Sequence, residues 1–391
     1  MIITKPELCT GCHACYNSCP MHCITMEENK EGFLYPQIDE DQCIGCKKCQ
    51  KSCPVNKKLE NTNPKRKAYA IRSLDENVRR DSSSGGVFSA LAFQVIKSGG
   101  IVVGAAFSKD FESLYHTEVM DCGELSRLRG AKYLQSTVGD TYGKVKTYLD
   151  TGRAVMFVGT PCQAEGLVAY LGDKPETLLL VDFICHGVPS PSIWRKYINS
   201  IRQKHNSTIE DINFRNKDLG WKMYSVKARL GNGKQYFSTH YEDTYMRGFI
   251  YKNLYLRDSC YKCEFKQENH IADITIADCW GAGKLCSELD DDKGLSMVLV
   301  HTEYGMKKIN EILEESRYKE ISFEDAIAAN PALVRCPEMP KERNAFFSEV
   351  NQGGNIQRIL QKYCGLSVLQ RCKHTMIKMK LRKPNGRGNG Y

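Results

Sequence analysis

The sequence predicts an α/β protein, α+β overall, in two parts: a small cysteine-rich module and a larger three-layer α/β domain with an antiparallel insertion. Two observations carry this prediction. The motif CTGCHACYNSCP at residues 9–20 recurs as CIGCKKCQKSCP at residues 43–54. Beyond residue 67, short apolar runs typical of buried strands alternate with segments of helical apolar spacing.

The chain has 391 residues, which at about 150 residues per domain suggests two or three domains. No apolar run approaches the roughly 18 residues that a membrane span needs. The N-terminus also lacks the charged and apolar regions of a secretory signal, so we expect a cytoplasmic protein. The predicted parts are a module at 1–56, a linker at 57–67, the main domain at 68–335, and a C-terminal helical extension with a basic tail at 336–391.

Nineteen cysteines in such a chain indicate metal or cluster binding, because the cytosol keeps thiols reduced. Each N-terminal motif has the C-x2-C-x2-C-x3-C-P spacing of bacterial ferredoxins that hold two 4Fe-4S clusters. Three close cysteines reach one cluster and the fourth reaches the other. Zinc is the alternative, but it favours two CxxC pairs with a longer gap. The predicted ligands are Cys9, Cys12, Cys15 and Cys53 for the first cluster, and Cys43, Cys46, Cys49 and Cys19 for the second.

The main domain is predicted element by element. Continuous apolar runs indicate buried strands, a proline at the first position favours a helix start, and Asn232-Gly233 is typical of a hairpin turn. The alternation favours a largely parallel sheet with helices on both faces. The expected strands are 68–73, 100–107, 153–160 and 177–185, the expected helices are 85–100, 161–172 and 191–205, and the hairpin is 226–237.

The stretch DSSSGG at 81–86 leads directly into a predicted helix. Free N–H groups at a helix start, with the helix dipole behind them, attract an anion such as a phosphate. Gly85 and Gly86 let a ligand approach the backbone. The alternative is simple capping by Ser83 or Ser84, and both interpretations remain open at this point.

A second set of cysteines stands at predicted strand ends. Cys162 and Cys185 each follow a buried strand, and Cys260 and Cys263 form a CxxC pair. Strand ends in an α/β sheet face the ligand crevice, so these four thiols are candidates for one metal site. The alternative is that each is a buried structural thiol.

Five motifs occur in order: SSSGGVFSAL, RGAKYLQS, VGTPCQAEGL, ICHGVPSPSIW and CYKCEF…ADITIADCWG. Together they resemble the coenzyme F-420 hydrogenase/dehydrogenase beta-subunit family over about residues 68–300. The resemblance implies a flavin, usually FAD, near a third 4Fe-4S cluster held by Cys162, Cys185, Cys260 and Cys263, with Cys279 as an alternative ligand. The implied flavin-site residues are Ser84, Gly85, Gly86, Lys132, Tyr133, Asp278, Trp280 and Gly281.

These features predict an iron–sulfur flavoprotein oxidoreductase that relays electrons from a low-potential donor through clusters to a flavin and an unidentified acceptor. His186, beside Cys185, is the candidate proton donor. The alternative is an electron-transfer subunit of a larger redox complex without its own substrate site. We expect a ferredoxin or a redox-complex subunit as partner and an anaerobic setting.

The tail from Arg371 to Tyr391 carries seven Lys and Arg and no acid. It is predicted to be a solvated end, and its charge is compatible with weak contact with an acidic membrane surface. Nucleic-acid binding is not expected, because the tail lacks the interleaved aromatic residues of such sites.

Overall fold

The computed structural model describes residues 3–59, 61, 64–367 and 369–370. The predicted basic tail therefore lies outside the described residues. Within them, no helix is long and apolar enough to cross a membrane.

The N-terminal module is built around its cysteines. Strands β1 (Ile24–Glu28) and β2 (Leu34–Ile38) form an antiparallel pair. Helices α1 (Ala14–Ser18) and α2 (Lys48–Lys51) each start directly inside one cysteine motif. The buried core of the module consists of Ile3, Ile24 and five cysteines. So small an apolar core gives limited hydrophobic stabilisation.

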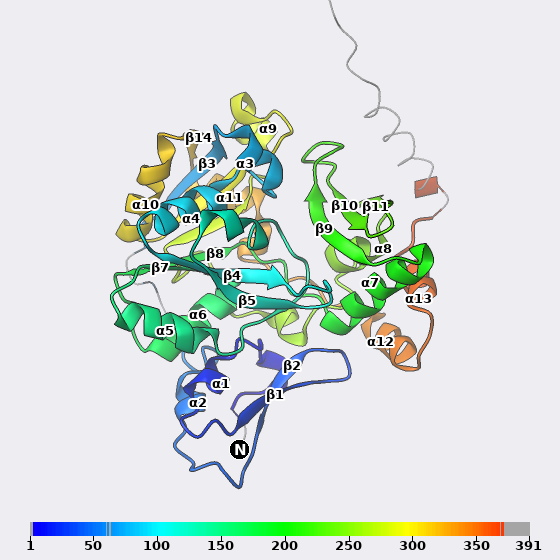
Figure 1. Ribbon diagram of the computed structural model, residues 1–391, viewed down its shortest axis with the longest axis horizontal. Helices are drawn as coiled ribbons and strands as arrows, with labels where there is room; N and C mark the ends of the chain where they lie inside the picture. The colour runs from blue at the N-terminus through cyan, green and yellow to red at the C-terminus, as the bar shows by residue number, and fades with distance from the viewer. Residues whose placement is uncertain (1–2, 60, 62–63, 368, 371–391) are drawn as a thin grey trace, which may run out of the picture.

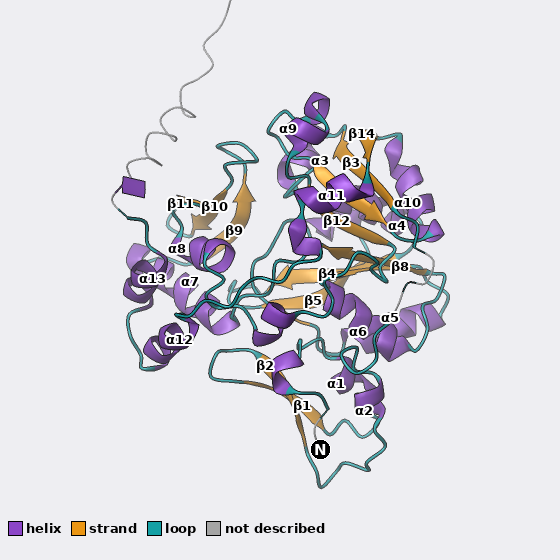
Figure 2. Ribbon diagram, turned by 180° about the vertical axis from the view of Figure 1, so that it is seen from behind, coloured by secondary structure: helices purple, strands orange, loops and turns teal. Residues whose placement is uncertain are grey.

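The main domain is a nine-stranded sheet in the order β14-β3-β13-β12-β8-β7-β4-β5-β6 (Figures 1 and 2). The predicted strands all form, each within a few residues of its expected limits. The strands are β3 (Lys67–Ser73), β4 (Ile101–Phe107), β5 (Leu114–Val119), β6 (Ser136–Thr137), β7 (Val155–Gly159), β8 (Leu178–Phe183), β12 (Ile274–Asp278), β13 (Ser296–Val300) and β14 (Ser316–Ile321).

Helices cover both faces of this sheet, which confirms the three-layer prediction. Side chains alternate along each strand, so Val102 packs toward α4 and α10 while Ile101 and Val103 pack toward α5 and α6. The helices are α3 (Glu76–Asp81), α4 (Val87–Lys97), α5 (Thr141–Asp150), α6 (Pro161–Leu171), α9 (Ala282–Leu285), α10 (Glu303–Leu313) and α11 (Phe323–Ala329).

The expectation of a largely parallel sheet is wrong. Only the centre, β4-β7-β8-β12, is continuously parallel. Antiparallel pairs flank it on both sides, β4 with β5 and β12 with β13, and β3 and β14 continue that pattern. The sequence did not predict the three strands after residue 270. These strands, β12, β13 and β14, form antiparallel pairs that make the sheet mixed.

The antiparallel insertion is larger than the predicted hairpin. The hairpin itself is confirmed, with Gly233 at φ +77 in its turn, and a third strand pairs with it. Helices from the predicted C-terminal extension share a core with it around Trp194, so this lobe joins distant segments (Figure 1). Its elements are α7 (Pro191–His205), β9 (Ile209–Asn216), β10 (Ser225–Leu230), β11 (Gln235–Thr239), α8 (Thr244–Met246), α12 (Arg343–Asn351) and α13 (Ile356–Cys364).

Candidate functional site

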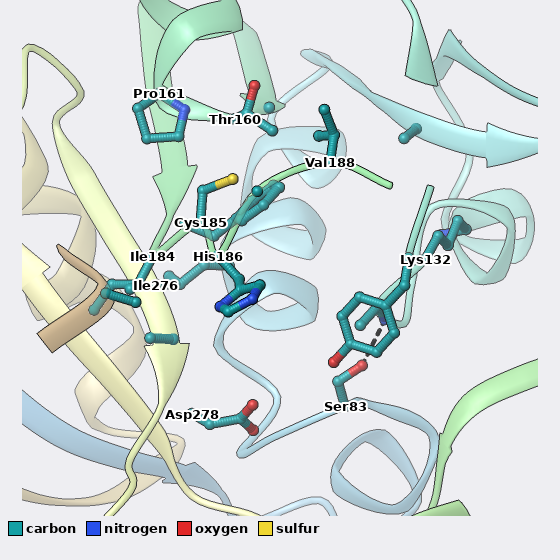
Figure 3. A pocket seen from close by; sticks show the side chains of 18 of the residues that line it. Ser83, Lys132, Thr160, Pro161, Ile184, Cys185, His186, Val188, Ile276 and Asp278 are labelled. Carbon is teal, nitrogen blue, oxygen red and sulfur yellow. Dashed lines mark hydrogen bonds between the residues drawn. The ribbon is translucent and has the colours of Figure 1, made fainter. Parts of the chain in front are cut away.

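A cavity of about 690 Å³ lies between the sheet and the lobe. It opens at the carboxyl ends of the parallel strands β7, β8 and β12, where open α/β sheets bind ligands. In Figure 3, Cys185, His186 and Asp278 come from one side of the cavity, and Ser83 and Lys132 face them from the other. Its volume is typical of small-molecule sites, about 300–1,000 Å³.

Cys162, Cys185, Cys260 and Cys263 converge on the wall of this cavity. Burial raises the pKa of Cys162 and Cys185 to about 11, and a neighbouring member of the set contributes to each increase. Two further groups touch the sulfurs: Thr160 Oγ1 lies 3.1 Å from Cys162 Sγ, and the Val188 N–H donates to Cys260 Sγ at 3.4 Å. The structure thus joins three separate sequence segments at one point.

Cys279, the alternative ligand, lies elsewhere. It is fully buried between α9 and α11 and contacts Cys286. Cys336 instead stands beside the set, with its Sγ 3.5 Å from the carbonyl oxygen of Cys263. The sequence offered no motif that pointed to Cys336.

The eight N-terminal cysteines lie close together, and neighbours are found within each of the two predicted groups. In the first group, burial raises the pKa of Cys15 to about 12, and Cys9, Cys53 and also Cys49 of the second group contribute to the increase. In the second group, burial raises the pKa of Cys49, and Cys19 and Cys46 contribute to the increase. All four members of this group line one small pocket. Cys23 is a fifth thiol there, with its Sγ 3.4 Å from that of Cys19.

Among the described residues, no group of three or more His, Cys, Asp or Glu side chains has the geometry that holds one metal ion. A cube of four irons and four sulfides is larger than a single ion. Cysteine sulfurs around it therefore stand farther apart than the ligands of one ion. The three cysteine groups are accordingly defined by the proximity of their thiols.

The first ferredoxin group lies against the set on the cavity wall. Cys162 lies close enough to Cys12 to contribute to the raised pKa of that thiol. A Cβ added to Gly166 of α6 would lie 3.1 Å from Cys12 Sγ. The second ferredoxin group lies on the outer side, where Cys46 is exposed. The three groups thus form a line from the surface to the cavity.

The turn before α4 does not use the serine cap that the sequence offered as one interpretation. Gly86, at φ +99, is the N-cap of α4, and no side chain caps it. Ser83 Oγ instead accepts from the Ala131 N–H at 2.6 Å, and Ser84 Oγ donates to the Leu295 carbonyl at 2.6 Å. Ser84 and Gly86 line the cavity, and Gly85 packs behind them, with its N–H donating to Ser296 Oγ. The start of α4 therefore faces the cavity without a capping side chain.

Lys132 and Tyr133 also line the cavity. Lys132 is half-buried, and its ammonium donates to the carbonyls of Leu128 and Arg129 at 3.0 and 3.1 Å. Burial lowers the pKa of Lys132 to about 7. Tyr133 accepts a hydrogen bond at its hydroxyl from Arg215, at 3.2 Å.

Asp278 and Trp280 form the opposite wall together with Arg215, which the sequence analysis missed. Arg215 binds Asp278 through two hydrogen bonds of 2.7 and 2.9 Å, and Trp221 Nε1 donates to the same carboxylate. Trp280 stacks on Trp221 with ring centroids 5.0 Å apart. Gly281 does not line the cavity. It is the N-cap of α9 and has the left-handed backbone conformation.

His186 lies beside Cys185 and lines the cavity. Its Nε2 is 2.7 Å from Asn253 Oδ1, and its ring meets Phe249 edge-on at 5.3 Å. Burial lowers the pKa of His186, so the imidazole is neutral at pH 7.

The charged side chains on the wall are mostly cationic, which favours an anionic ligand. Asp278 is the acidic residue of the wall, and Arg215 neutralises it. The cationic residues are Arg129, Lys132, Arg215, Lys222, Arg257 and Lys266.

Comparison with known families identifies both parts of the chain. Residues 152–326 match the family of the C-terminal domain of the coenzyme F420 hydrogenase/dehydrogenase beta subunit. Residues 8–57, which hold all eight N-terminal cysteines, match a "4Fe-4S dicluster domain", and a second description of that domain matches 35–83. The resemblance predicted from the motifs is therefore confirmed.

Among solved structures, a chain of the F420-reducing [NiFe] hydrogenase complex from Methanosarcina barkeri, studied as a xenon derivative, is similar at 16% identity and a TM-score of 0.45. The match covers 70% of this chain and 93% of that chain. Comparison with curated proteins finds no significant match.

Proposed function

We propose that this chain is an iron–sulfur flavoprotein oxidoreductase, because residues 152–326 match the family of the C-terminal domain of the coenzyme F420 hydrogenase/dehydrogenase beta subunit. The N-terminal cysteines would hold two 4Fe-4S clusters, and Cys162, Cys185, Cys260 and Cys263 would hold a third. When bound, these clusters would supply one-electron transfer from a low-potential donor to a flavin, FAD in our proposal, that would serve an unidentified acceptor. The main support is the position of Cys162, Cys185, Cys260 and Cys263 between Cys12 and the cavity.

The residues of the cavity fit a flavin nucleotide. The free N–H groups at the start of α4, at Gly86, Val87 and Phe88, suit its diphosphate, and the wall is cationic. Trp280 and Tyr133 offer aromatic surface for its ring. When bound, a flavin supplies the exchange between one-electron and two-electron transfer.

We place the point where electrons enter at the second ferredoxin group. Cys46 is exposed there, and Ile44 beside it is 64% exposed, which suits transient docking of a redox protein. We also propose a cytoplasmic, oxygen-free setting, because an exposed cluster is readily oxidised.

The test is the content of iron, acid-labile sulfide and flavin in protein purified without oxygen. Three clusters correspond to about twelve irons per chain, with about one flavin. The variant Cys185→Ser should lower the iron content to about eight. Cys122→Ser is the matched control, since Cys122 lies outside the three groups, and it should retain the full content.

A wild-type content of about eight irons with no flavin would contradict the proposal. That result would favour the alternative, an electron-transfer subunit that has no substrate site of its own.

A further inference from the structure

The two cysteine motifs of the N-terminal module have matching backbones but opposite surroundings. Gly11 and Gly45, at the same position of each motif, both have φ +67. Two residues later, His13 and Lys47 both adopt the left-handed conformation and are the N-caps of α1 and α2. The motifs can therefore be compared position by position, and a difference in burial shows what covers each of them.

The first motif is covered by the main domain. Residues 10–14 are all buried, and a Cβ added to Gly11 would lie 2.9 Å from side-chain nitrogens of Arg257 and Gln135. Helix α1 packs against α5 and α6, and Asn17 of α1 donates to a backbone carbonyl of the main domain at 2.8 Å. This face of the motif is thus an interface within the chain.

The same face of the second motif is open. Residues 44–48 are all exposed, and a Cβ added to Gly45 would have no neighbour within 4 Å among the described residues. In Figure 2, α2 lies on the side of α1 that points away from α6. The second motif therefore presents to solvent the face through which the first motif contacts the main domain.

The open face differs in chemistry from the covered one. At four matched positions the first motif has no fixed charge, whereas the second has one isoleucine and three lysines. The pairs are Thr10 and Ile44, His13 and Lys47, Ala14 and Lys48, and Asn17 and Lys51. Residues 43–54 contain no Asp or Glu, and the three lysines form no ion pair with another described residue. We call the second set, Ile44 with the three lysines, the lysine face.

An apolar patch and an exposed thiol belong to the same place. Ile44 is 64% exposed and Met21 is 44% exposed, and both line the small pocket of the second cysteine group together with Lys47. Cys46, a predicted cluster ligand, is exposed in that pocket. Apolar contacts next to a polar, charged rim are typical of protein–protein interfaces.

We propose that the lysine face is the docking site of a small acidic redox protein. The lysines attract carboxylates of the partner, and Ile44 and Met21 contact its apolar surface. This inference rests on the proposed function, which places a cluster behind Cys46. A second copy of this chain fits less well, because its net charge is +9 and two such faces would oppose lysine to lysine.

The acidic residues that precede the motif leave this face positive. Asp39, Glu40 and Asp41 lie between β2 and the motif, outside the positions that correspond to the covered face. The Asp39 carboxylate accepts from Gln42 Nε2 at 2.5 Å and from the Asp41 N–H at 3.1 Å, so it is engaged within its own turn.

The first test measures binding of an oxidised, acidic ferredoxin to the full-length protein by anaerobic titration calorimetry. Wild-type affinity should fall about tenfold between roughly 20 and 300 mM salt, because salt screens exposed charges. The triple variant Lys47→Asn, Lys48→Gln, Lys51→Gln should bind about tenfold more weakly at low salt and depend less on salt. Asparagine is used at position 47 because it tolerates the φ of +59 there.

The matched control removes three exposed lysines of the main domain and the lobe, by Lys109→Gln, Lys196→Gln and Lys234→Gln. Its net charge equals that of the triple variant, so a general effect of charge would appear in both. Its affinity should stay within about twofold of wild type. Equal loss in both triple variants, or wild-type binding that does not change with salt, would overturn the proposal.

The second test separates the docking site from the proposed flavin chemistry. Reduction by the reduced ferredoxin is followed as loss of iron–sulfur absorbance, which needs no flavin. The triple variant at the lysine face should react more slowly with ferredoxin, but not with reduced methyl viologen, a small cation that lysines do not attract. This pattern in protein without flavin would refute the proposed function and keep the docking site.

Two outcomes of the second test would refute the docking site itself. One is an equal rate with ferredoxin in wild type and in the triple variant. The other is binding of phosphatidylserine vesicles, lost in the triple variant, without salt-dependent binding of ferredoxin, which would assign the lysines to a membrane surface.

Discussion

At the residue scale, Arg257 ties the N-terminal module to the main domain. Its side chain is fully buried, and its Nε donates to the Cys9 carbonyl at 2.6 Å. The other nitrogens donate to the Leu34 carbonyl and to Gln135, and the guanidinium lies 4.2 Å above the Tyr35 ring. It thus places a positive charge beside a predicted cluster ligand.

We predict that Arg257→Met lowers the reduction potential of the first ferredoxin cluster. Loss of a nearby cation disfavours an added electron by roughly 50–150 mV at protein-like screening. A redox titration followed by electron paramagnetic resonance measures this change. Arg257→Lys keeps the charge but not the forked hydrogen bonds, so its potential should shift less. An unchanged potential in Arg257→Met would show that the cation does not act on the cluster.

Glu165 of α6 provides a prediction about stability and pH. Burial raises its pKa from 4.5 to about 8 in the folded protein, so the folded state holds a proton that the unfolded state has lost between these values. Stability must therefore fall as pH rises from about 5 to 8 and level off above, by up to roughly 5 kcal/mol. Glu165→Gln should flatten this part of the profile in urea unfolding. A wild-type profile parallel to that of the variant would contradict the buried, protonated carboxyl group.

At the element scale, the turn before α4 depends on close backbone packing. A Cβ on Gly85 would lie 2.2 Å from the Ile71 carbonyl oxygen and 2.6 Å from the Ser296 nitrogen, both in neighbouring strands. Backbone atoms cannot move aside as a flexible side chain can. Gly85 therefore allows the turn before α4 to pack closely against the sheet. The opposite side of this turn lines the cavity.

We predict that Gly85→Ala destabilises the protein by about 1–3 kcal/mol and reduces its retention of flavin. Gly99→Ala is the matched control, because Gly99 has a positive φ of +80 but open space around its Cα. The control should lose stability without losing flavin. Thermal unfolding and flavin content measure the two effects, and equal flavin loss in both variants would contradict the role of the turn.

At the scale of the whole molecule, the arrangement of the three cysteine groups predicts the route by which electrons enter the protein. Cys43→Ser with Cys46→Ser should remove the outermost cluster. Reduction of the remaining centres by a ferredoxin should then slow strongly, because electrons would lose the exposed point at which they enter. Reduction by dithionite, a small molecule that reaches less exposed centres, should change less. Stopped-flow absorbance with each donor compares the two, and equal slowing with both would argue against this route.

The sequence alone predicted an iron–sulfur module at the N-terminus, because two repeats of the C-x2-C-x2-C-x3-C-P spacing are a local signal. It also predicted the central strands and the hairpin, because continuous apolar runs and an Asn-Gly turn are local signals. The mixed order of the sheet was missed, since β12, β13 and β14 are short and pair with strands far away in the chain.

The cavity wall was decided by the tertiary structure. The sequence predicted that Cys162, Cys185, Cys260 and Cys263 meet, but only the fold separates Cys279 from them and brings Cys336 beside Cys263. The roles of Arg215 and Arg257 have no sequence signature, because each depends on a hydrogen-bond partner more than 60 residues away. Local spacing determined the recognisable motifs of the chain, and packing between distant segments decided where their residues lie.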